Sequence, residues 1–143
     1  MKKRIIAIAV AVCLLFSLHL TADARGTLSS EYIDSIMVSV QALGDSSMNV
    51  RVVIFANAQM SEIGVSSLVV EESKSSNGPW SIKKSWNCSG SAYYEKGTNK
   101  FVGDFSFTGT PGYYYRASMV GYAEQSSTQR DQSPADSYII KCT

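Results

Sequence analysis

The chain has 143 residues, with 13 basic side chains, 12 acidic side chains, one histidine and three cysteines, and its formal net charge is +1. This length fits one ordinary domain. Apart from residues 2–4, this nearly neutral chain has no basic run and so offers no electrostatic footprint for nucleic acid, which excludes partners held by their phosphate charge.

The first 24 residues have the three parts of a secretory signal peptide. Three basic residues, 2–4, precede an apolar run from residue 5 to about residue 20, and residues 21–24 (TADA) form a small-x-small cleavage pattern. We predict a signal helix, cleavage after Ala24, and release of the mature protein from a bacterial cell, with no membrane contact after cleavage. The alternative is a retained membrane anchor, but an anchor needs about 20 apolar residues, and this run is shorter and contains His19.

Cleavage would remove groups that much catalysis depends on. The only histidine, His19, leaves with the signal, so the mature chain has no imidazole for Ser-His-Asp, Cys-His or histidine–zinc chemistry. Three of the 13 basic residues and one of the 12 acidic residues also leave, which gives ten against eleven. Cys13 is lost as well. Cys88 and Cys142 remain as an even pair in an exported chain, for which we predict a disulfide, with two free or intermolecular thiols as the alternative.

The mature chain is predicted to begin with a polar lead, residues 25–31, followed by a single β-domain over residues 32–143. Its apolar residues recur at two-residue spacing, as in half-buried strands, and no segment has a convincing helical spacing. The polar segment 124–136 is predicted to be a connection, and residues 89–100 have no clear pattern. The predicted strands are 36–42, 49–58, 63–72, 80–86, 101–108, 113–119 and 138–142.

Three local patterns predict finer structure. Val65 and the run from 68 to 70 are out of phase across Ser66-Ser67, which indicates a β-bulge there. Turn residues 74–79 predict an antiparallel hairpin. We expect its second strand to place Trp80, Ile82 and Trp86 together on the core face. In the last strand, we expect Tyr138 and Ile140 to lie in phase with Cys142.

Seven short strands separated by polar turns in about 119 mature residues predict an all-β fold, namely a sandwich of two antiparallel sheets. A small β-barrel is the main alternative.

Two short motifs carry a resemblance to known proteins. The hairpin NGPWSIKKSW, residues 77–86, and the strand GYYYRA, residues 112–117, resemble a group of small secreted proteins of clostridia and their relatives, a domain family of unknown function. The resemblance implies no catalytic residues. The Gly-Tyr-x-Tyr-x-Ala alternation is also similar to the sixth strand of fibronectin type III and immunoglobulin-like domains, and this second likeness concerns fold alone.

The candidate binding surface lies in and near the segment PGYYYRASMVGY, residues 111–122. At period two, its odd-numbered residues from 113 to 119 form an apolar core face. The hydroxyl of Tyr113 is expected to bond the backbone of the preceding turn, as in a tyrosine corner. Tyr114 and Arg116 fall on the opposite face, and Asn77 at the polar hairpin tip is a further candidate.

No arrangement of residues identifies a catalytic, cofactor or metal site. We predict a secreted, non-enzymatic binding or structural module for an extracellular protein or glycan, with adhesion or carbohydrate contact as the most concrete version and its oligomeric state open. One alternative is a secreted antagonist, such as a toxin or bacteriocin. The other is a hydrolase that uses two carboxylates, although adjacent Glu71 and Glu72 would point to opposite faces of a strand. The candidate carboxylates are Glu71, Glu72, Glu95, Asp104 and Glu124.

Overall fold

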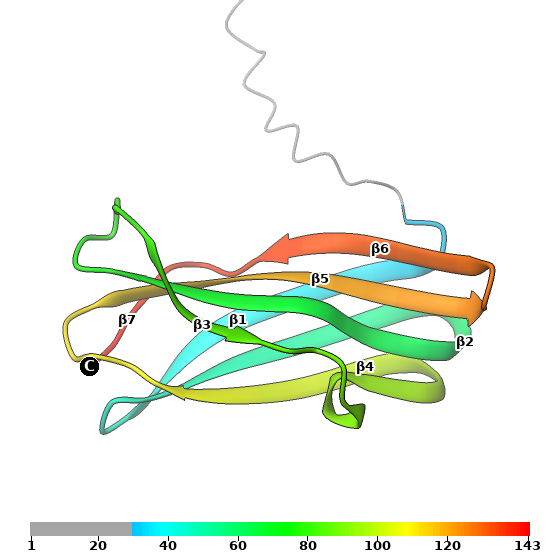
Figure 1. The fold of residues 1–143 in the computed structure, drawn as a ribbon, viewed down its shortest axis with the longest axis horizontal. Coiled ribbons are helices and arrows are strands. Elements are labelled where there is room, and N and C mark those ends of the chain that lie inside the picture. The colour runs from blue at the N-terminus through cyan, green and yellow to red at the C-terminus, as the bar shows by residue number, and fades with distance from the viewer. Residues whose placement is uncertain (1–29) are drawn as a thin grey trace, which may run out of the picture.

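The computed structural model describes residues 30–143; the predicted signal peptide and nearly all of the polar lead lie outside the described residues. The described part consists of seven β-strands and one short 3-10 turn (Figure 1). The elements are β1 (Ile33–Gly44), β2 (Ser47–Ser73), β3 (Ser81–Trp86), η1 (Ser91–Tyr93), β4 (Tyr94–Thr108), β5 (Tyr114–Ser126), β6 (Gln129–Asp136) and β7 (Ile140–Lys141).

All seven strands belong to one antiparallel sheet that is organised around β2. Along one edge, the first half of β2 pairs with β1 and the second half with β5; along the other edge, β2 pairs with β4 and then with β3. β5 continues the sheet to β6 and β7. In the middle of β2, the four residues from Ala56 to Gln59 stand opposite a single residue of β4, Asn99. Near this irregularity β2 doubles back, and the sheet curls like a half-barrel (Figure 1).

The fold is therefore all-β, but the predicted two-sheet sandwich is not confirmed, and the small-barrel alternative fits the curled sheet. Residues 49–58 and 63–72, predicted as two strands, belong to one continuous strand of 27 residues. No glycine or proline turn separates them, so the chain bends through a bulge without ending the strand.

β6 also corrects a prediction, because it lies within the polar segment that we expected to be a connection. Its residues have no apolar alternation, and it contains Pro134. A strand that pairs on one side and has few apolar side chains tolerates proline and lacks the usual sequence signal. The seven observed strands are thus not the seven predicted ones.

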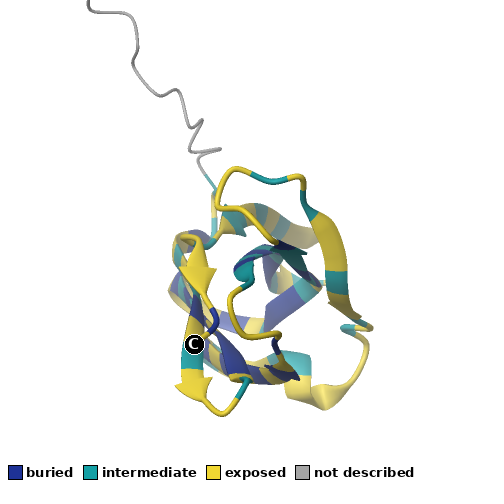
Figure 2. Ribbon diagram, turned by 90° about the vertical axis from the view of Figure 1, so that its left-hand side faces the viewer, coloured by how far each residue is buried: buried dark blue, intermediate teal, exposed yellow. Residues whose placement is uncertain are grey.

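The core fills the inside of the curl (Figure 2). The apolar inner face predicted for β5 is confirmed, since Tyr115, Ala117 and Met119 are buried and Tyr113 packs partly against them. The predicted bulge is confirmed as well, because the pairing of β2 with β5 shifts between Val65 and Ser67. Other strands contribute the buried residues Val50, Val52, Ile54, Phe101, Phe105 and Phe107.

The predicted antiparallel hairpin of β2 and β3 forms, but its side chains do not share one face. A register shift between Val70 and Glu71 leaves Lys83 as an extra residue in β3. This bulge reverses the alternation, so that Ile82 is 69% exposed whereas Trp86 packs against Phe105, with ring centroids 6.1 Å apart. A shared core face for the residues of β3 was therefore a wrong prediction.

The last predicted strand needs a similar correction. Tyr138 is 91% exposed and Ile140 lies at the surface, whereas Cys142 is buried. The segment between β6 and β7 is irregular and bonds to β5 through Ser137, whose N–H donates to the carbonyl of Ala117 at 2.8 Å. Two-residue alternation does not extend across such an irregular segment.

Tyr115, and not Tyr113, makes the contact expected of a tyrosine corner. Its hydroxyl accepts the N–H of Thr110 in the preceding turn at 2.7 Å and donates to Glu72 at 3.0 Å. The hydroxyl therefore ties the β4–β5 turn to β2. Burial, together with the nearby Glu72 carboxylate, raises the pKa of Tyr115 above its ordinary value.

The predicted disulfide is absent from the structure, where Cys88 and Cys142 are both free thiols. Cys88 follows β3 and lies beside Trp86, whose carbonyl its thiol contacts. Cys142 is buried beneath the β4–β5 turn, so close to Gly109 that a side chain at this glycine would collide with its sulfur. The curled sheet thus holds the two thiols apart, and burial raises the pKa of the Cys88 thiol.

Candidate functional site

The candidate site lies on the outer face of the sheet, where the β2–β3 hairpin meets β5 and β7. Outward-facing residues of four neighbouring segments come together there, because the pairing places them in adjacent rows. We call this surface the outer patch. Its members are Glu71, Trp80, Ile82, Tyr114, Arg116 and Lys141.

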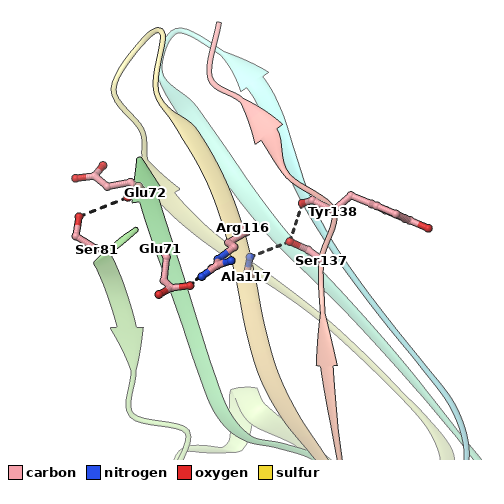
Figure 3. A network of polar contacts seen from close by, with 7 residues as sticks. All are labelled: Glu71, Glu72, Ser81, Arg116, Ala117, Ser137 and Tyr138. Atoms are coloured by element: carbon pink, nitrogen blue, oxygen red, sulfur yellow. Dashed lines mark hydrogen bonds and ion pairs between the residues drawn. The ribbon is translucent and has the colours of Figure 1, made fainter. Parts of the chain in front are cut away.

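Arg116 is the centre of the outer patch (Figure 3). It stands opposite Glu71 in the β2–β5 ladder, and its Nε lies 2.7 Å from a carboxylate oxygen of this residue. Its guanidinium carbon lies 4.5 Å from the ring centroid of Trp80, within the range of a cation–π contact. One cation is therefore fixed between an anion and an aromatic ring, and its orientation is set before any ligand arrives.

Tyr114 and Lys141 extend the patch toward the chain end. The two residues face each other across the β5–β7 pair, and the amino group of Lys141 lies 5.6 Å from the Tyr114 ring centroid. Tyr138 projects from the connection between β6 and β7, on the side of β5 away from Glu71 (Figure 3). Its exposure gives this end of the molecule a large aromatic side chain in solvent.

Asn77, the third predicted binding residue, lies at the exposed tip of the hairpin. Its N–H bonds to the hydroxyl of Ser75 at 3.3 Å. The next residue, Gly78, has φ of 85°, and a side chain there would collide with the Trp80 ring at 2.9 Å. The tip thus holds Trp80 in place over β5, whereas Asn77 is not part of the outer patch and forms no hydrogen bond to it within the described residues.

The carboxylates of this region do not form a catalytic pair. Glu71 and Glu72 point to opposite faces, as predicted: Glu71 bonds Arg116, whereas Glu72 accepts the Tyr115 hydroxyl and pairs with Lys83 at 3.2 Å. Two other candidate carboxylates, Asp104 and Glu124, pair with Arg51 and Arg130. Each of these four carboxylates has its own cation, which favours structural ion pairs.

A further polar cluster lies at the opposite end of the outer face. The Tyr122 hydroxyl donates to Glu62, and the guanidinium carbon of Arg130 lies 4.1 Å from the Tyr122 ring centroid. Burial, followed by the Glu62 hydrogen bond, raises the pKa of Tyr122 strongly. Tyr122 is buried within these contacts.

Within residues 30–143, no group of histidine, cysteine or carboxylate side chains is arranged to hold a metal ion. The same residues contain no helix long and apolar enough to cross a membrane.

Sequence reasoning placed Tyr114 and Arg116 on one face, and the structure brings both into the outer patch. It missed Trp80 and Ile82, which were expected in the core, and the exposure of Tyr138, which was expected only to lie in phase with Cys142. The outward position of Ile82 depends on the bulge in β3, and that of Trp80 depends on the hairpin tip. The proline and glycine before Trp80 were a signal that its backbone leaves the strand geometry.

No family model matches the chain, and no curated protein matches its sequence. The resemblance to small secreted clostridial proteins therefore remains a prediction.

Proposed function

We propose that this protein is a secreted, non-enzymatic binding module that contacts carbohydrate at a cell surface through the outer patch. The observation that carries the proposal is the fixed triad of Trp80, Arg116 and Glu71. Side chains that are already held in place lose little conformational freedom on binding, which favours affinity. Secretion rests on the signal-peptide pattern of the first 24 residues.

The aromatic side chains support a sugar as the ligand. Tyrosine and tryptophan offer a broad apolar face with a polar tip, which suits the alternating CH and OH groups of a sugar ring. Tyr138 and Tyr114 stand at the same end of the molecule as Trp80, and Ile82 adds an exposed apolar side chain.

Charge further favours an acidic glycan over a neutral one. Two acidic residues, Glu71 and Glu72, lie in the hairpin from Glu71 to Trp86 and in the segments that face it, 114–116 and 140–141. The same segments contain five basic residues: Lys74, Lys83, Lys84, Arg116 and Lys141. This end is positive in a chain that is otherwise acidic, and it would attract a polyanion.

A glycan array that contains neutral and acidic polysaccharides tests the proposal. We expect the purified protein to bind acidic glycans, with binding that weakens as salt is added. The double substitution Tyr114→Ala with Arg116→Ala should weaken binding by about tenfold or more, because it removes two central contacts.

The matched control is Met37→Ala, which changes a side chain of β1 that is 56% exposed and lies outside the patch. It should bind like the unaltered protein. Unchanged binding by the double variant, with its fold verified by circular dichroism, would show that the outer patch is not the site. Failure of the unaltered protein to bind any glycan would reject carbohydrate as the ligand.

A further inference from the structure

The edge of β4 that faces away from β2 pairs with no other strand of the described part of the chain. Within the described residues β4 pairs with β2 alone, and it runs along the lower margin of the molecule in Figure 1. An open strand edge presents a row of backbone N–H and C=O groups to which another strand can bond. The strand is 15 residues long, so the open edge is extensive.

Three hydrogen bonds show which residues of β4 direct their backbone groups out of this edge. The carbonyl of Ser106 accepts the amino group of Lys84 at 3.2 Å, and the N–H of Lys100 donates to the Thr98 hydroxyl at 3.2 Å. On the opposite side, the N–H of Gly109 bonds to Ser46 beside the start of β2 at 2.8 Å. Both backbone groups of a residue in an antiparallel strand point to the same neighbour, so the even-numbered residues from 100 to 108 face the open edge.

The side chains of these even-numbered residues lie on the outer face, since Phe101 and Phe105 between them are buried. Val102 is 38% exposed. Lys100 is exposed and forms no ion pair with any residue in the described part of the chain, and Asp104 is half exposed beside Arg51. A shallow depression of about 320 Å³ follows the same strand and is lined by Glu95, Lys96, Thr98, Lys100 and Val102.

We propose that two copies of this chain pair along their β4 strands, antiparallel, with a two-fold axis at Val102. In this register Val102 faces Val102 of the second copy, and Lys100 faces Asp104 of the second copy on each side of the axis. All of these pairs use backbone groups that point out of the open edge. The two half-barrel sheets then become one continuous sheet across the dimer.

The charges along the edge favour a second copy as the partner, because the edge is complementary to itself. Sliding one strand by two residues in either direction places Lys100 or Asp104 opposite Val102 of the second copy and leaves no opposite charge pair. Sliding it by four residues places Lys100 opposite Lys100 of the second copy in one direction, and Asp104 opposite Asp104 in the other. Like charges directly opposite each other destabilise a strand pair. Only the register centred on Val102 combines an apolar pair at the axis with an opposite charge pair on both sides.

Two existing contacts define the extent of the paired segment. The Thr98 hydroxyl must release the N–H of Lys100, which then bonds the second copy. The amino group of Lys84 covers the carbonyl of Ser106 and so marks the far end of the segment. This inference does not depend on the proposed function, although a dimer would display two outer patches.

Sedimentation analysis of the intact protein with two charge-reversal variants tests the pairing. Lys100→Glu alone and Asp104→Lys alone each place like charges opposite each other twice, and each should raise the dimer dissociation constant about tenfold or more. An equal mixture of the two variants restores both attractive pairs in the heterodimer, so the mixture should regain the dissociation constant of the unaltered protein. Circular dichroism checks that each variant is folded.

A backbone variant provides an independent test. Val102→Pro removes the N–H at the axis but leaves the bonds between β4 and β2, so it should yield a folded monomer; Val102→Ala keeps that N–H and should still dimerise. The proposal is overturned if the unaltered protein is monomeric at its highest soluble concentration, or if the mixture dimerises no better than its components. A dimer that survives Val102→Pro would lie at another interface and would overturn it too.

Discussion

At the scale of single residues, the three consecutive tyrosines 113–115 have three different roles. Tyr113 packs partly against the core, Tyr114 faces outward beside Lys141, and Tyr115 is fully buried with a bonded hydroxyl. Alternation along a strand is enough to separate Tyr114 from its neighbours. Alternation cannot show which of the two inward tyrosines bonds the turn through its hydroxyl, because this contact depends on how the β4–β5 loop folds back.

The Tyr115 hydroxyl should contribute measurably to stability. Tyr115→Phe leaves the N–H of Thr110 and the Glu72 carboxylate without this partner, so we expect a loss of about 1–2 kcal/mol in the free energy of unfolding. Denaturant unfolding monitored by fluorescence measures the change. Tyr113→Phe is the matched control, because its hydroxyl bonds no residue in the described region, and it should change stability little. Equal effects of the two substitutions would contradict the assignment.

At the scale of elements, β1 is fastened to β6 through one carboxylate. Asp131 accepts hydrogen bonds from the Ser30 hydroxyl and from the N–H of Tyr32, and the N–H of Ile33 in turn donates to Ser30 at 2.7 Å. Partial burial by itself raises the pKa of Asp131, but these bonds and the N–H of Gln132 outweigh burial, so that the pKa lies below its ordinary value. The start of the first described strand is thus held by an ionised group.

This contact predicts a specific dependence of stability on pH. Because the pKa of Asp131 is lower in the folded than in the unfolded chain, its carboxylate stabilises the fold above the unfolded pKa. That contribution is lost as the pH falls through the folded pKa. Asp131→Asn should therefore be less stable than the unaltered protein at neutral pH, and the difference should shrink toward about pH 3.

Unfolding curves collected across that pH range measure the difference. Asp136→Asn, on the same strand but without a side-chain bond in the described part of the protein, serves as the control. A difference that stays constant with pH would show that the Asp131 carboxylate does not act through its charge.

The two bulges, in β2 and in β3, show how far local sequence patterns predict structure. The bulge at Ser66-Ser67 was visible because it interrupts an apolar alternation. The bulge at Lys83 was not, because Trp80, Ile82 and Trp86 all keep an even spacing through it. Much of the outer patch follows from this second bulge and from the hairpin tip, so the sequence could predict Tyr114 and Arg116 but not their neighbours.

At the scale of the whole molecule, the bend of β2 decides which distant residues meet. Cys88 and Cys142 do not meet, although their number and the expected export favoured a bridge. A disulfide requires Cα atoms within about 7 Å of each other and suitably directed side chains. Counting cysteines gives no information on that distance.

We therefore expect two reduced cysteines in the folded protein. Thiol labelling after unfolding without reductant should modify both residues, and added reductant should leave the thermal midpoint unchanged. The unreduced protein should have the mass of the dithiol form. A mass lower by two hydrogens, together with a midpoint that falls on reduction, would show that the bridge forms and that the two chain segments lie closer than described.

The sequence by itself determined that this chain is rich in strands, which face of β5 is buried, and that residues 74–79 turn the chain into a hairpin. These properties follow from the spacing of apolar side chains and from turn residues, which act over a few neighbours. Only the tertiary structure decided that β2 is continuous, that the sheet curls on itself, and that Trp80, Arg116 and Tyr114 share a surface. Those outcomes depend on bulges and on pairing between distant strands, where the energy of the whole sheet selects the register.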